Sequence, residues 1–88
     1  MIDELTLAVV FGGDGYWDEL HSRLLAADHG RGDRLRRAWR RTRVAQLLAN
    51  GDGEQAIAVD VGCSLRTVEG DVALIRLVLR PDDLEAAA

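Results

Sequence analysis

Hydrophobic positions recur at helical spacing along most of the chain. Val68, Val72, Ile75 and Leu79 are separated by four, three and four residues, which places them on one face of a helix. The apolar residues between positions 16 and 28 follow the same spacing. The pattern predicts an all-α protein, a small helical domain of about five helices.

Residues 1–30 are expected to form an N-terminal helical segment. The run over 2–11 is mostly apolar with acids at its front, which favours a helix, although a short buried strand fits the same run. The glycines of Gly12–Gly15 then interrupt the chain. Asp14 is expected to cap the next helix, which covers about residues 16–28.

An arginine-rich helix is predicted over residues 33–50. Asp33 is a suitable N-cap, and Asn50 with Gly51 forms a suitable C-cap. One side of this helix is expected to be buried and consists of Leu35, Ala38, Trp39, Thr42, Ala45 and Ala49. The other side carries arginines: Arg36, Arg37, Arg40, Arg41 and Arg43. Trp17 and Trp39 are predicted to anchor the core.

Residues 53–80 are predicted to form two helices joined by a turn. The first is short and covers about 53–61, and Gly62 with Cys63 forms the turn. Ser64 is expected to cap the last helix, which runs to about Arg80. All of these elements are expected to belong to one domain, residues 1–88.

Composition excludes several classes of function. The single cysteine, Cys63, permits neither an intrachain disulfide nor a cysteine metal cage. The sequence holds no nucleophile–base–acid constellation, so we expect neither an enzyme nor a bound cofactor or metal. The start of the chain is acidic and no apolar run is long enough to span a membrane, which predicts a cytoplasmic protein. The net charge of −4 argues mildly against nucleic acid as a partner, but local patches decide binding.

The segment after residue 43 has the residue types that a helix-turn-helix requires. Ala58 allows two helices to cross closely, and Gly62 suits the bend that follows. Ser64 begins the second helix, and Val68 can pin that helix onto the first. The remaining face of the second helix is then free to enter a groove of DNA.

The same segment carries a family pattern of apolar, small and hydroxyl residues. It consists of Leu47, Leu48, Ala49, Asn50, Gly51, Ile57, Ala58, Val61, Ser64, Thr67, Val68, Val72 and Ile75. This pattern resembles the DNA-binding domain of LuxR-type response regulators and, second, region four of sigma factors. The resemblance covers about residues 43–80 and does not extend to the first forty residues. It implies a bacterial transcription regulator that binds double-stranded DNA.

The resemblance also implies which residues contact DNA. The residues that would face the groove are Leu65, Arg66, Glu69, Gly70 and Ala73, and Ser64 and Thr67 would contact phosphates. Glu69 and Asp71 depart from the family, which usually has basic residues there. We expect two carboxylates at these positions to repel phosphate.

Two functions follow from these observations. The first is a small regulator, expected to be a homodimer, that binds DNA through residues 53–80, with Arg36, Arg37, Arg40, Arg41 and Arg43 adding phosphate contacts. The arginines are equally well explained as a solvated face balanced by acids such as Asp28 and Asp33. The alternative function is a helix-turn-helix interaction module, an anti-activator or adaptor, in which Glu69 and Asp71 suit a basic protein partner.

Overall fold

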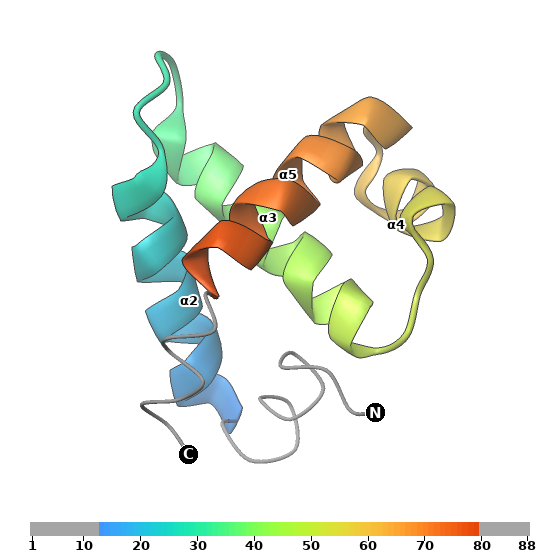
Figure 1. The fold of residues 1–88 in the computed structure, drawn as a ribbon, viewed down its shortest axis with the longest axis horizontal. Helices are drawn as coiled ribbons and strands as arrows, with labels where there is room; N and C mark the ends of the chain where they lie inside the picture. Colours follow the sequence, from blue (N-terminus) through green and yellow to red (C-terminus); the bar gives the residue numbers. More distant parts are fainter. Residues whose placement is uncertain (1–12, 80–88) are drawn as a thin grey trace.

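Helices joined by short loops make up the computed structural model, which describes residues 13–79 and contains no strand in that range (Figure 1). The helices are α2 (Gly13–Ala27), α3 (Arg34–Ala49), α4 (Glu54–Val61) and α5 (Leu65–Val78). The all-α prediction is therefore confirmed for the described residues. The element expected over residues 2–11 lies outside them, so the count of about five helices stays a prediction.

Two helices occupy the centre of the fold. α3 and α5 each pack against the other three described helices, whereas α2 and α4 lie on opposite sides and hardly touch (Figure 1). The core between them is built from aliphatic side chains of all four helices: Leu20, Leu24, Val44, Ala45, Leu47, Ile57, Ala58, Val68, Val72 and Ile75. The buried stripe predicted for the last helix is confirmed at Val68, Val72 and Ile75, and Leu79 packs against the edge of the core.

The predicted ends of α3 are confirmed. A side-chain oxygen of Asp33 accepts a hydrogen bond from the Arg36 backbone N–H at 3.0 Å, as an N-cap does. At the other end, Gly51 has a φ of +93° and its N–H donates to the carbonyl oxygen of Leu48 at 2.9 Å. A positive φ favours glycine, so this residue ends the helix without strain.

The start of α2 differs from the prediction. The helix already begins at Gly13, so Asp14 lies inside the first turn and does not precede it. The expectation that Asp14 caps this helix is therefore wrong. Glycine disfavours a helix but does not forbid it, and here the helix continues through Gly15.

The predicted buried side of α3 is correct only in part. Ala38, Thr42 and Ala45 are buried, but Leu35 is 52% exposed and Trp39 is 59% exposed. The prediction that Trp39 anchors the core is wrong, whereas Trp17 is half-buried and packs against the core. Because α3 contacts three helices, its buried side is centred further round the helix and leaves Leu35 and Trp39 at the edge.

Candidate functional site

The turn between α4 and α5 has the geometry that its residues predict. Gly62 has a φ of +78°, a left-handed conformation that ends α4 and favours glycine. The Ser64 Oγ then accepts a hydrogen bond from the Thr67 backbone N–H at 3.1 Å. The hydroxyls of Ser64 and Thr67 are also hydrogen-bonded to each other at 2.9 Å. The cap fixes the start of α5 and holds two hydroxyls beside it.

The first half of α5 presents one continuous exposed face. We call it the α5 face, and its residues are Leu65, Arg66, Glu69, Gly70 and Ala73. These are the five residues that the family resemblance places toward DNA, and the structure brings them together on one side of the helix. Nothing lies within 4 Å of a Cβ built on Gly70, so no packing requirement explains glycine there.

Asp71 does not belong to that face. It is 2% exposed, and its carboxylate is held from α3 by a two-pronged contact with Arg40, at 2.8 Å from Nε and 2.7 Å from Nη2. Arg41 Nε donates to the same carboxylate at 3.0 Å. The expectation that Asp71 faces phosphate, or a basic partner, is therefore wrong. Of the two acids that depart from the family, only Glu69 is exposed.

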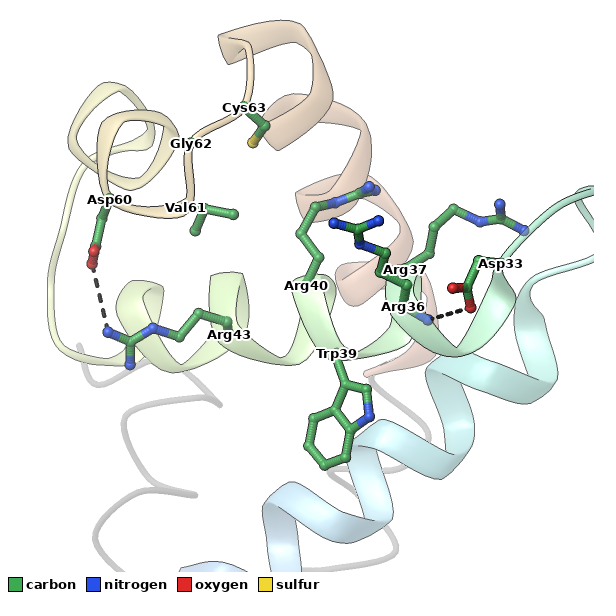
Figure 2. A pocket seen from close by; sticks show the side chains of 10 residues that line it. All are labelled: Asp33, Arg36, Arg37, Trp39, Arg40, Arg43, Asp60, Val61, Gly62 and Cys63. Atoms are coloured by element: carbon green, nitrogen blue, oxygen red, sulfur yellow. Dashed lines mark hydrogen bonds and ion pairs between the residues drawn. The ribbon is translucent and has the colours of Figure 1, made fainter.

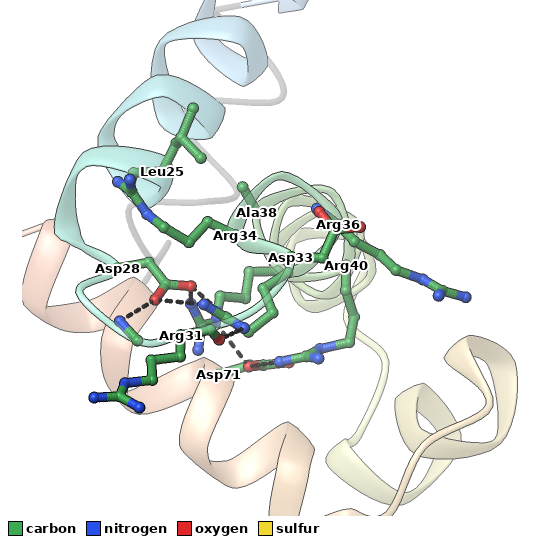
Figure 3. Close-up of polar contacts among 12 residues, drawn as sticks. Leu25, Asp28, Arg31, Asp33, Arg34, Arg36, Ala38, Arg40 and Asp71 are labelled. Carbon is green, nitrogen blue, oxygen red and sulfur yellow. Dashed lines mark hydrogen bonds and ion pairs between the residues drawn. The ribbon is translucent and has the colours of Figure 1, made fainter.

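The same arginines reach a second buried carboxylate. Asp28, at the end of α2, is 6% exposed and accepts from Arg37 Nη2 at 3.0 Å and from Arg41 Nη1 at 2.9 Å (Figure 3). Arg41 thus bridges the two acids. We call this set the arginine–aspartate network: Asp28, Arg37, Arg40, Arg41 and Asp71. It ties the loop after α2 to α3 and α5.

Hydrogen bonds in this network shift the ionisation of its members. The side-chain hydrogen bond from Arg37, followed by the Gly30 backbone N–H at 2.8 Å, holds the pKa of Asp28 far below its ordinary value of 3.8. Partial burial acts in the opposite direction but is the smaller effect. The carboxylates in turn raise the pKa of Arg37 and of Arg40. Asp28, Arg37 and Arg40 are therefore charged near neutral pH.

These contacts divide the five arginines that the sequence proposes for binding. Arg37, Arg40 and Arg41 are half-buried and bound to carboxylates. The sequence interpretation in which acids such as Asp28 balance the arginines expects this pairing for Asp28. Asp33 serves as a cap instead. Arg36 is exposed, and within residues 13–79 its guanidinium has no ion pair. Arg43 is 55% exposed and only approaches Asp60, at 3.6 Å.

An open groove of about 800 Å³ runs beside α3, between that helix and the end of α4 (Figure 2). Arginines and one aromatic ring line its α3 side, and the turn lines the other: Asp33, Arg36, Arg37, Trp39, Arg40, Arg43, Asp60, Val61, Gly62 and Cys63. Figure 2 shows Arg40 directed toward the turn and Trp39 directed away from it. The sequence does not predict this groove, because it exists only where α3 and α4 approach each other.

The burial of Asp71 had a signal in the sequence. Asp71 follows Val68 by three residues and precedes Ile75 by four, so helical periodicity places it on the buried stripe. A buried carboxylate requires a cationic partner, and α3 is rich in arginine. Which arginines would meet it depends on the packing of α3 against α5.

The net negative charge of the chain is not carried by residues 13–79. Residues 13–79 contain ten arginines and ten acidic residues, so their formal charge is zero. The net charge of −4 comes from residues 1–12 and 80–88. The mild argument from net charge against nucleic acid therefore does not apply to the surfaces of the described helices.

Within residues 13–79 no group of three or more histidine, cysteine or acidic side chains is placed to hold a metal ion. None of the described helices is long and apolar enough to cross a membrane. Comparison with known proteins gives no match: neither a family model nor a curated protein nor a solved structure is similar to the chain. The function is therefore argued from the chemistry of the surfaces.

Proposed function

We propose that residues 53–80 form a helix-turn-helix with which the protein binds double-stranded DNA as a small transcription regulator. The observation that carries the proposal is the α5 face, which is exposed while the opposite side of the same helix is fixed in the core. A helix presented in this way fits the major groove of DNA. The capped start of α5 and the left-handed Gly62 are the local features that such a unit requires.

Arg66 has the central role in this proposal. It is the basic residue of the α5 face, and an arginine contacts the O6 and N7 atoms of guanine through two parallel hydrogen bonds. Leu65 and Ala73 offer apolar contact to a thymine methyl group. Glu69 is the one acid on this face, and an acid can accept a hydrogen bond from the amino group of cytosine.

The hydroxyls at the start of α5 support contacts to phosphate. Ser64 and Thr67 together have two hydroxyl protons, and their mutual hydrogen bond uses one of them. The other is available to donate to a phosphate oxygen. Arg36 and Arg43 line the groove beside α3, whose opposite wall includes the turn that precedes α5.

The test is binding to a fluorescent mixed-sequence duplex at about 50 and 200 mM salt, followed by anisotropy. We expect the full chain to bind at the lower salt and to weaken at least about tenfold at the higher salt, because phosphate contacts release counterions. Arg66→Ala should weaken binding and reduce the salt slope by about one phosphate contact, because it removes the cation of the α5 face. Arg23→Ala, which removes an exposed arginine of α2, should behave as the wild type. No binding by the wild type at about 50 mM salt would rule the proposal out.

Glu69 distinguishes this proposal from the alternative, a module that binds a basic protein. That alternative rested on two acids, and the burial of Asp71 leaves it Glu69 alone. Glu69→Lys should strengthen duplex binding, because it removes a charge that repels phosphate. If Glu69→Lys leaves duplex binding unchanged or weakens it, the α5 face does not contact DNA in the way proposed.

A further inference from the structure

A second exposed surface runs along α3 and is not used by the proposed function. We call it the α3 stripe, and it consists of Leu35, Arg36, Trp39 and Arg43. Each of the other three residues is three or four positions from Trp39, so the set shares one side of the helix. Leu35 is 52% exposed and Trp39 is 59% exposed, so two large apolar side chains lie next to each other on this surface.

Within residues 13–79, the Trp39 ring contacts one other aromatic ring. Its centroid lies 4.2 Å from that of the His21 ring on α2, with an angle of 37° between the ring planes. This contact orients the indole, while more than half of the side chain stays accessible. An aromatic ring that is fixed on one face and open on the other is a platform on which another flat ring can stack.

Two cations flank this platform. Arg36 and Arg43 are seven residues apart, which corresponds to about 10 Å along the helix axis. Arg36 has no ion pair within the described residues. Arg43 forms a long ion pair, at 3.6 Å, with the half-exposed Asp60. Beside them lies the open groove, whose α3 wall also holds Arg37 and Arg40. Arg37 and Arg40 are bound to Asp28 and Asp71, so Arg36 and Arg43 are the donors near the platform that are suited to phosphate.

We propose that the α3 stripe and the adjoining groove bind single-stranded nucleic acid, with a base stacked on Trp39 and phosphates held by Arg36 and Arg43. Aromatic platforms next to a basic groove bind single strands with little sequence preference, because every base has a flat π-face. A duplex does not offer this contact, since its bases are stacked on one another. This proposal is independent of the α5 face.

An acidic protein segment is the other partner that the charges allow. A stable protein interface buries about 800 Å² on each partner around a well-packed apolar centre. The apolar part of the α3 stripe is limited to Leu35 and Trp39, which is too small for such a centre. One exposed ring between two arginines is, by contrast, sufficient for a nucleotide.

The first experiment measures binding of a fluorescein-labelled oligothymidylate of about twelve nucleotides, within the usual site size of such surfaces, at about 50 mM salt. We expect the full-length protein to bind. Trp39→Ala should weaken binding about 5- to 100-fold, the range that base–aromatic stacking spans. Trp39→Phe should retain part of the affinity. Because Trp39 is exposed, these variants should fold, which far-UV circular dichroism checks.

Matched variants separate this surface from the α5 face. Arg36→Ala combined with Arg43→Ala should weaken oligothymidylate binding, whereas Arg23→Ala should not. Arg66→Ala should weaken binding of the duplex and leave binding of the single strand as it is. Failure of this inference and failure of the proposed function are thereby distinguishable.

Tryptophan fluorescence gives the second measurement. In a Trp17→Phe background Trp39 is the only indole of the chain, and oligothymidylate should quench its emission. The inference is overturned if the oligonucleotide does not bind at about 50 mM salt, or if Trp39→Ala binds as well as the wild type. It is also overturned if a poly-glutamate peptide quenches Trp39 and the oligonucleotide does not, which would assign the stripe to an acidic protein.

Discussion

Asp71 shows how one side chain changes the interpretation of a surface. In the sequence it is an acid beside Glu69 on a helix proposed to meet DNA. In the structure its carboxylate points to the inside, where Arg40 and Arg41 neutralise it (Figure 3). Glu69 remains exposed two residues earlier. The two neighbouring acids therefore have unrelated roles, one in stability and one at the surface.

Asp71→Asn should destabilise the protein by about 3 kcal/mol, because it leaves two half-buried guanidinium groups without a neutralising charge. Both arginines keep some contact with water, so we expect the lower end of the range for broken buried pairs. Urea unfolding followed by circular dichroism measures the effect. Glu69→Gln is the matched control and should change stability by no more than about 0.5 kcal/mol. Equal effects of the two substitutions would show that the buried pair is not stabilising.

At the scale of the element, α5 has a capped start but a residue of low helix propensity in its middle. Ser64 caps it, and Val68, Val72 and Ile75 bind it to the core. Gly70 interrupts this pattern, because glycine loses more conformational entropy in a helix than any other residue. Its position on the α5 face leaves open space where a side chain would stand.

Replacing Gly62 or Gly70 with alanine should change the stability of the protein in opposite directions. Gly70→Ala should stabilise the protein by about 1 kcal/mol, because the site is helical and a methyl group meets no atom within 4 Å. Gly62→Ala should destabilise it by about 1 kcal/mol or more, because its φ of +78° is unfavourable for alanine. Thermal unfolding of the two variants beside the wild type checks both signs. If the Gly70→Ala variant is less stable than the wild type, the helix is strained at this point.

At the scale of the whole molecule, the arginine–aspartate network adds polar contacts between helices that the aliphatic core also joins. Asp28 follows α2, Asp71 lies in α5, and the arginines between them come from α3. The network uses three of the six arginines of α3 for internal pairing. The exposed charges that remain for a partner include those on the α5 face and the α3 stripe.

The network should make the protein sensitive to acid. The pKa of Asp28 is lower in the folded state than its ordinary value of 3.8. Its charged form therefore stabilises the fold at neutral pH, and this contribution is lost as the pH falls through about 5 and below. Asp28→Asn removes the titrating group, so it should be less stable than the wild type at pH 7 and lose less stability on acidification. Urea midpoints measured between about pH 7 and 3 test this. Parallel pH profiles for the two proteins would show that Asp28 does not contribute.

Sequence reasoning was most successful for features that depend on near neighbours. The caps at Asp33 and Ser64, the turn at Gly62 and the buried stripe of α5 follow from residues within about one helical turn of each other. The residues of the α5 face are those that the family resemblance implies, and they lie opposite the buried stripe. These predictions succeed because hydrogen bonds and side-chain spacing within a helix are local.

Only the tertiary structure decided how the sides of α3 are used. Its contact with three helices left Trp39 and Leu35 exposed and turned Arg37, Arg40 and Arg41 toward two buried acids. The groove beside α3 likewise depends on how α4 packs. Partners in such contacts are up to thirty-one residues apart in the chain, so no local pattern specifies them. The sequence by itself determined the helices and the surface of α5, whereas packing decided which charges stay free to meet a partner.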